Sequence, residues 1–264
     1  MSLLHELARG KYSVVVDLIP SSDSAGHTAF AHAVLDGSMA GRVWVDAVAK
    51  PLSAIVGHVS GFHLAFGEGT DALLWAGLEV LGRIPTIEPG VLWATSDSWD
   101  RAITESGMGP QERHEFAPPR TGSDSTPAPE GYRLESLDLN AVRQIEERID
   151  DWIVRAWGGA EAFCAGSFGV GAYAGEELVA FCAACAVSRE SEHAEAEIEI
   201  VTAPDHRGRG LGFAAASAFI GECRTRGLAP SWSCAAENVA SRRLAEKLGF
   251  VFLRRIRGVP IPRQ

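Results

Sequence analysis

The chain has 264 residues and a formal net charge of −10, with 46% hydrophobic and 22% charged residues. This balance is typical of a soluble globular protein, and no apolar run approaches the length that spans a membrane. An acidic chain also binds nucleic acid poorly, so the composition argues against both a membrane and DNA or RNA as partners.

The N-terminus and the cysteines together favour a cytoplasmic protein. The first residues do not form a basic segment followed by a long apolar core, so we expect no signal peptide. All five cysteines follow residue 163. Cys182 and Cys185 lie three apart in a predicted strand and would point to opposite faces, which suits neither a metal site nor a redox pair. We interpret the cysteines as small buried thiols and expect no metal.

A segment rich in Pro, Ser, Thr and Gly divides the chain. The sequence "APPRTGSDSTPAPEG" at residues 117–131 has no hydrophobic periodicity and is typical of a linker. We therefore expect two domains, residues 1–118 and 131–264, joined by a linker at 119–130.

The first domain is predicted to be α/β from its middle onward. Apolar residues and turn signals predict strands at 41–49, 52–59 and 61–67, then a helix at 70–82. A short strand and a helix follow within 91–109. His58 and His63 would pair on one face of a hairpin, but two ligands do not make a closed metal site.

The second domain is predicted in more detail. A strand opens it at 131–138, and residues 140–157 have a helical pattern in one or two pieces. A hairpin with a turn at Gly175 is predicted at 168–188, and alternating Glu and Ala or Ile predict a strand at 194–203. A helix at 210–227, a short strand at 230–234 and a helix after Asn238 complete the pattern.

Two segments resemble each other. "VLWATSDSWDRAITESGMG" and "PSWSCAAENVASRRLAEKLGF" each place a Trp in a short strand, then lead through Ser to a helix that ends at Gly. This similarity suggests a degenerate internal duplication. Two ordinary α/β units that match by chance are the alternative.

A glycine-rich turn is the strongest functional signal. The sequence "HRGRGLG" follows a strand and begins a helix, and no acid occurs between Asp205 and Glu222. Free backbone N–H groups at a helix N-terminus bind phosphate, and Gly208, Gly210 and Gly212 remove side chains that would keep a ligand away. Residues 203–264 also hold 11 Lys and Arg against four Asp and Glu.

Two common phosphate motifs do not match this turn. The dinucleotide pattern G-x-G-x-x-G fails at Phe213, and the chain has no Gly-Lys-Ser/Thr of a nucleotide P-loop. A strand-to-helix corner without a ligand is the structural alternative.

The arrangement Arg207-x-x-Gly210-x-Gly212, with the closing "ENVASRRLAEKLGF", resembles the GNAT N-acetyltransferase superfamily. The chain is more loosely similar to a subgroup with an extra N-terminal domain that includes zwittermicin-resistance acetyltransferases. This resemblance implies an α/β (α+β) fold. A mixed GNAT sheet flanked by helices would fill residues 131–264, and a smaller degenerate GNAT-like copy would fill residues 1–118.

The resemblance also implies acetyl-CoA as co-substrate and a direct attack of an amine on the thioester. The pantetheine arm would lie where the strand ending at Val201 separates from the strand at 231–234. The implied cofactor-binding residues are Val201, Thr202, Ala203, Arg207, Gly208, Arg209, Gly210, Leu211, Gly212, Asn238 and Ser241.

Two candidate catalytic residues follow. Glu195, Glu197 and Glu199 share one strand face, and we expect Glu199, nearest the turn, to be the general base. A solvated strand face is the alternative. Many members of the superfamily have a Tyr seven residues after the Asn that opens the last helix, where it serves as the general acid. This chain has Ala245 at that position. Ser241 is the candidate acid, with Cys234 as a second.

The acceptor is expected to be a small cationic molecule with a primary amine, and a homodimer is compatible with the sequence. The turn "FGEGTDALL" of the first domain has two acids and no Arg. We expect that copy not to bind CoA and to form a wall of the acceptor site.

The alternatives for the function of the chain are a catalytically weak or inactive CoA-binding sensor or scaffold, and an acetyltransferase of proteins or peptides. The acyl chain length is left open.

Overall fold

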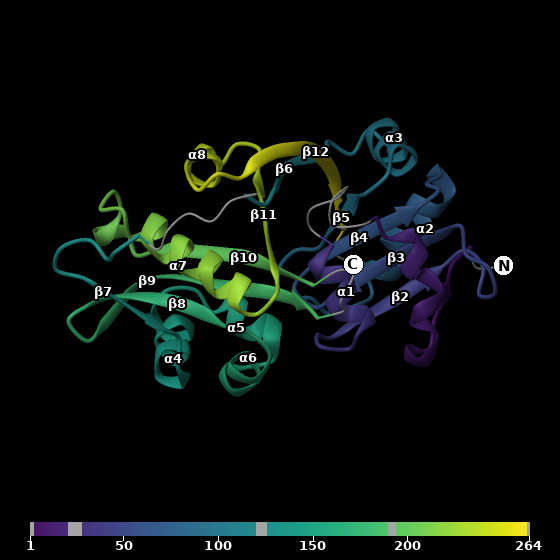
Figure 1. The fold of residues 1–264 in the computed structure, drawn as a ribbon. Coiled ribbons are helices and arrows are strands. Elements are labelled where there is room, and N and C mark those ends of the chain that lie inside the picture. Colours follow the sequence, from purple (N-terminus) through teal and green to yellow (C-terminus); the bar gives the residue numbers. More distant parts are fainter. Residues whose placement is uncertain (1–2, 21–27, 120–125, 190–193, 263–264) are drawn as a thin grey trace.

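In the computed structural model, which describes residues 3–20, 28–119, 126–189 and 194–262, the strands form one mixed sheet. Within these residues the strand order is β1-β2-β3-β4-β5-β12-β6-β11-β10-β9-β8-β7. Helices lie on both faces of this sheet, so the fold is of the α/β class that the sequence predicts (Figure 1). None of the described helices has both the length and the apolar character needed to cross a bilayer.

The N-terminal half, residues 3–119, supplies the first six strands. Its elements are β1 (His5–Glu6), the 3-10 helix η1 (Arg9–Leu18), α1 (Ala29–Leu35), β2 (Gly41–Val45), β3 (Ser53–His58), β4 (Phe62–Gly67), α2 (Asp71–Leu81), β5 (Val91–Ala94), α3 (Asp97–Glu105) and β6 (Gln111–Ala117). The strands and helices predicted between residues 41 and 109 are all confirmed. The sequence did not predict β1, η1, α1 or β6.

The C-terminal half, residues 126–262, supplies the other strands. Its elements are β7 (Arg133–Ser136), α4 (Leu139–Arg148), α5 (Trp152–Trp157), α6 (Ala160–Gly166), β8 (Gly169–Ala174), β9 (Glu177–Ser188), β10 (Glu195–Thr202), the 3-10 helix η2 (Pro204–His206), α7 (Leu211–Thr225), β11 (Ala229–Ala235), α8 (Val239–Lys247) and β12 (Val251–Pro260). The Gly175 hairpin is confirmed, and so is the cap of α8, where Asn238 accepts a hydrogen bond from the Ser241 N–H.

The two halves exchange strands at the centre of the sheet. β6 of the N-terminal half lies between β11 and β12 and is antiparallel to both, while β12 continues onto β5. Figure 1 shows β12 as a yellow strand that runs between the two halves. The backbone hydrogen bonds of one half therefore complete the sheet of the other, and the domain division at residues 119–130 remains a prediction.

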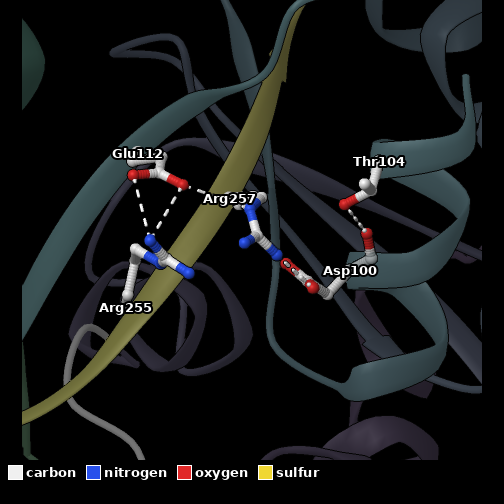
Figure 2. A network of polar contacts seen from close by, with 5 residues as sticks. All are labelled: Asp100, Thr104, Glu112, Arg255 and Arg257. Atoms are coloured by element: carbon white, nitrogen blue, oxygen red, sulfur yellow. Dashed lines mark hydrogen bonds and ion pairs between the residues drawn. The ribbon is translucent and has the colours of Figure 1, made fainter. Parts of the chain in front are cut away.

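An ionic network attaches β12 to the N-terminal half (Figure 2). The Arg257 guanidinium contacts Asp100 of α3 at 2.6 Å and Glu112 of β6 at 3.2 Å. Arg255 contacts Glu112 at 3.4 Å. Arg257 and its two partners are each only about one quarter to one third exposed, so solvent screens this network less than an isolated surface pair.

Among the described residues of the N-terminal half, the corresponding strand pair, β4 and β5, stays paired further along than β10 and β11 do. β4 and β5 are parallel and stay paired to Ala65 and Ala94, and Thr95 N–H continues the ladder to Ala65 O. The fully buried Trp99 donates its indole N–H to Phe66 O, and a Cβ on Gly69 would lie 2.6 Å from the Trp99 backbone. The side chain and backbone of Trp99 thus occupy the space beside the turn between β4 and α2.

Candidate active site

The parallel strands β10 and β11 separate partway along their length. They pair only through Glu195, Ala196 and Glu197. β10 continues to Thr202 without β11 beside it, which opens a cleft in the sheet at the point that the sequence predicted. A cavity of about 860 Å³ occupies this cleft and extends to the N-terminus of α7.

The glycine-rich turn lies at the N-terminus of α7, after the strand β10, as its sequence predicts. Gly208 and Gly210 have φ values of 75° and 82°, which favour glycine, and Gly210 is the N-cap of α7. No acid lies in the first turn of α7, so its free N–H groups meet no competing carboxylate. This end of the cavity is therefore suited to an anion such as a phosphate.

Most of the predicted cofactor-binding residues line this cavity. They are Val201, Thr202, Arg207, Gly208, Gly210, Leu211, Gly212, Asn238 and Ser241. Ala203 and Arg209 do not line it. Ala203 donates its N–H to Val179 O, and the Arg209 guanidinium contacts the Tyr132 hydroxyl at 2.9 Å.

A smaller cavity of about 210 Å³ adjoins the first. Both halves of the chain line it, with the aromatic side chains of Phe30, Phe62 and Trp152 on its walls. Four residues line both cavities and so mark their junction: Arg113, Ile198, Glu199 and Ser233. A molecule in the smaller cavity would thus meet the end of a long ligand in the cleft.

Glu199 lies at this junction and has an altered pKa. Burial raises the pKa of its carboxyl to about 7, Asp150 adds to the rise, and Arg113 opposes it. A carboxylate with a pKa near neutrality takes up and releases protons readily at physiological pH. The sequence predicts Glu199 as the general base, and this role remains a prediction.

The other two glutamates of β10 are buried and hydrogen-bonded. Glu197 accepts from the Ser231 hydroxyl and, at 3.2 Å, from the Ser233 hydroxyl. Glu195 accepts from the Thr28 hydroxyl at 2.6 Å, and burial raises its pKa to about 8. Both are only 2% exposed, so the solvated strand face considered from the sequence is wrong for this pair.

Ser241 lines the larger cavity, but its hydroxyl already has neighbours. The Trp232 indole N–H donates to Ser241 Oγ at 3.1 Å, and Ser241 also hydrogen-bonds the Cys234 thiol. Ala245, at the position where many relatives have Tyr, is fully buried. The role of Ser241 as an acid remains a prediction.

The sequence did not identify Arg113, Asp150, Phe30 or Phe62 as site residues. Arg113 comes from β6, the strand that the sequence did not predict, and its guanidinium donates to Ser233 Oγ at 2.9 Å. Its position depends on pairing between residues more than 100 apart, for which the local sequence carries no signal. Trp152 packs against the hydrophobic core and also lines the smaller cavity.

Four of the five cysteines and the His58–His63 pair lie in the interior. All five cysteines are free, and four are buried, but Cys164 is exposed, so its prediction as a buried thiol was wrong. His58 and His63 are buried in the N-terminal half, where the His58 N–H donates to His63 Nδ1 at 3.2 Å. Burial lowers their pKa values to about 3 and about 4, so both imidazoles are neutral at physiological pH.

Comparison with known proteins gives one family. A family model described as GNAT acetyltransferase matches residues 23–257. A Bacillus subtilis protein named "Uncharacterized N-acetyltransferase YdfB" is 27% identical over 256 residues, which cover 95% of each chain.

Solved structures of similar proteins extend over almost the whole chain. A GCN5-related N-acetyltransferase-like protein from Streptococcus suis has a TM-score of 0.72 at 24% identity and covers 96% of this chain and 99% of its own. A tandem GNAT protein from the clavulanic acid biosynthesis pathway has a TM-score of 0.61 at 15% identity and covers 98% of each chain. These two similarities concern the fold.

Proposed function

This chain belongs to the GNAT acetyltransferase family, and we propose that it transfers an acetyl group from acetyl-CoA to the primary amine of a small cationic molecule. It is an acetyltransferase, and proteins of its family generally use acetyl-CoA. The single observation that carries the proposal is the meeting of the two cavities at Glu199, whose pKa is about 7.

The larger cavity fits the shape and charge of CoA. Its outer end has the free N–H groups of α7 and Arg207, which would hold a pyrophosphate. Its inner end lies between β10 and β11, where residues 198–202 have no β11 partner and a pantetheine arm would lie along this strand edge. When bound, acetyl-CoA would supply an activated acetyl group at the junction.

The residues at the junction can move the protons that amine acetylation requires. An ammonium in the smaller cavity would give one proton to Glu199, and the resulting amine would attack the thioester carbonyl carbon. The carbon–sulfur bond would then break with its electron pair on sulfur. The nitrogen loses two protons in all. One passes through Glu199 to solvent, and the other ends on the sulfur of CoA.

The smaller cavity is suited to a cationic acceptor. Asp150, Glu197 and Glu199 line it against a single cationic side chain, Arg113. Phe30, Phe62 and Trp152 add aromatic faces, which attract cations and apolar groups alike. Its volume of about 210 Å³ favours a small molecule over a long peptide, which would need an open groove.

Calorimetry with acetyl-CoA, combined with a thiol-release assay over a panel of small amines, tests the proposal. We expect one binding site per chain, because Trp99 occupies the space beside the turn between β4 and α2 in the N-terminal half. We also expect amine-dependent release of CoA that depends on Glu199. An absence of CoA binding would contradict the cofactor assignment.

A CoA-binding sensor or scaffold is the second candidate, because Ala245 replaces the usual Tyr and the Ser241 hydroxyl contacts Trp232 and Cys234. Binding of CoA without release from any amine in a broad panel would favour this second function.

A further inference from the structure

A single cationic side chain stands where the two cavities meet. Of the four described residues that line both cavities, Glu199 is the candidate base, Ile198 is apolar, Ser233 carries a hydroxyl and Arg113 carries the positive charge. Arg113 belongs to β6 and is therefore the contribution of the N-terminal half to this junction.

The Arg113 guanidinium is held in place from several sides. Its Nε and Nη2 groups donate to Ser233 Oγ at 3.3 and 2.9 Å, and the same Ser233 hydroxyl donates to Glu197. Its Cζ atom lies 5.5 Å from the ring centroid of Phe62 and 5.6 Å from that of Trp93. Such contacts fix a planar cation and reduce the entropy it would lose when it meets a ligand.

The Arg113 guanidinium has one N–H group, Nη1, that no described residue accepts from. Among the residues that the structure describes, Arg113 forms no ion pair, and its Nη1 group donates no hydrogen bond. Its charge reaches both sides of the junction: burial raises the pKa of the Glu199 carboxyl and that of the Cys234 thiol, and the Arg113 charge opposes the rise in each of them. It therefore acts on a sulfur atom that already lies close to the cleft.

Acetyl transfer places new negative charge at this junction. The attacking amine forms a bond to the carbonyl carbon, the carbon–sulfur bond breaks, and the electron pair leaves on sulfur. Arg cannot be deprotonated at physiological pH and so cannot act as an acid, but a charge-assisted hydrogen bond stabilises an anion in a site of low dielectric. This stabilisation is the contribution that a Tyr at position 245 would otherwise make by proton transfer.

We propose that Arg113 is a further catalytic residue, which stabilises the departing CoA thiolate in place of the missing general acid. This inference rests on the proposed function. It also gives the N-terminal half a direct part in catalysis, in addition to its part in lining the acceptor cavity.

The charged groups around the junction set the expected size of the effect. Glu197 and Glu199 on β10 and Asp150 after α4 are negative or titratable and would raise the pKa of a bound thiol, whereas Arg113 would lower it. Glu197 already accepts from two serine hydroxyls. An opposite charge in contact typically shifts a pKa by about 1–3 units, so the effect of Arg113 is large enough to measure.

The test follows the ionisation of the thiol of bound CoA by the ultraviolet absorbance of the thiolate, with CoA alone and no acceptor. The complex with desulfo-CoA supplies the baseline for the protein cysteines. Arg113→Gln should raise the pKa of the bound thiol by at least about one unit relative to the wild-type complex. Arg113→Lys should raise it less, while Arg255→Gln, at an exposed position of β12, should leave it unchanged.

Turnover gives a second readout. Arg113→Gln should lower kcat by about 10²–10³-fold, the usual cost of one donor to a transition-state anion, with CoA affinity within about threefold of the wild-type value. An Arg113→Gln protein whose bound thiol titrates at the same pH as in the wild-type protein would overturn the inference. A raised KM for acceptors that bear a carboxylate, with an unchanged thiol pKa in Arg113→Gln, would also overturn it and assign Arg113 to acceptor binding.

These results are separable from failure of the proposed function. The titration needs only CoA binding, so a protein that binds CoA but acetylates no amine still tests Arg113. A protein that binds no CoA fails at the calorimetric step, which contradicts the proposed function before Arg113 is examined.

Discussion

Glu197 and Ser231 lie opposite each other in the last residue pair that joins β10 to β11, and the Ser231 hydroxyl donates a hydrogen bond to the Glu197 carboxylate. This pair closes the inner end of the cleft. Beyond it β10 loses its β11 neighbour, and the next carboxylate on the same strand face, Glu199, reaches the junction of the two cavities. The hydrogen-bonded pair thus determines where the cleft ends and where acetyl transfer would take place.

The first prediction concerns Glu199 as the base. Since a base must be ionised and the pKa of Glu199 is about 7, kcat/KM should rise with pH through about 7 and then level off. Glu199→Gln should lower kcat by about 10²–10⁴-fold and remove this acidic limb, with CoA affinity unchanged. A pH–rate profile of both proteins checks this, and an unchanged limb in the variant would exclude Glu199 as the base.

The second prediction concerns the glycine turn. Gly210→Glu places a side chain on a residue with φ of 82° and adds a negative charge beside the N-terminus of α7. Loss of the helix-terminus interaction and the added repulsion should weaken CoA binding by roughly 100-fold or more. Gly175→Glu is the matched control, because Gly175 also has a positive φ but lies in the β8–β9 hairpin turn. Equal affinities of the two variants, measured by calorimetry, would contradict the site.

The third prediction concerns the acceptor cavity. Trp152→Ala should raise KM for the amine by roughly tenfold or more, since burial of an aromatic side chain is worth about 1.5–3 kcal/mol. The affinity for CoA should stay the same, because Trp152 lines only the smaller cavity. Trp75→Ala, at an exposed position of α2, is the control. Steady-state kinetics with any amine that is turned over would separate the two effects.

The fourth prediction concerns the network in Figure 2. Arg257→Ala removes contacts to both Asp100 and Glu112 and should lower the free energy of unfolding by roughly 1–2 kcal/mol. Arg255→Ala is the matched control, because the Arg255 side chain is 50% exposed and contacts only Glu112 in this network; its effect should stay within about 0.5 kcal/mol. Thermal unfolding measures both. Equal effects would mean that the contact with α3 adds little.

The fifth prediction concerns the buried carboxyl of Glu195. Its pKa in the folded protein is raised to about 8, so folding favours the protonated form. This contribution to stability is complete below the ordinary carboxyl pKa of 4.5 and is lost as pH rises through about 8. Glu195→Gln cannot ionise and still offers an oxygen to Thr28. Its Tm should therefore match that of the wild-type protein at pH 5 and exceed it by a few degrees at about pH 9.

The exposed Glu79 provides the control for this comparison. Glu79→Gln should shift Tm by nearly the same amount at both pH values. A Glu195→Gln protein that loses stability with pH as steeply as the wild type would show that another group causes the loss.

Local elements were predictable from the sequence because their signals lie within a few residues of each other. The alternation in residues 194–203, the cap at Asn238 and the turn at Gly175 each depend on neighbouring residues, and each has its predicted form. The glycine turn belongs to the same class, since its positive φ values and its lack of acids are local properties. These features were sufficient to indicate a phosphate site and, with the closing helix, the superfamily.

The tertiary structure alone decided how the two halves combine. β6 enters the sheet between β11 and β12, and this pairing brings Arg113 to Ser233 across 120 positions of the chain. The same packing places Phe30 and Phe62 against the cleft and fills the space beside the turn in the N-terminal half with Trp99. Residues far apart in sequence meet only through strand register and burial in the whole sheet, and neither is a property of a short segment. The sequence by itself therefore determined most of the local elements and indicated a kind of site, whereas long-range pairing decided which side chains meet there.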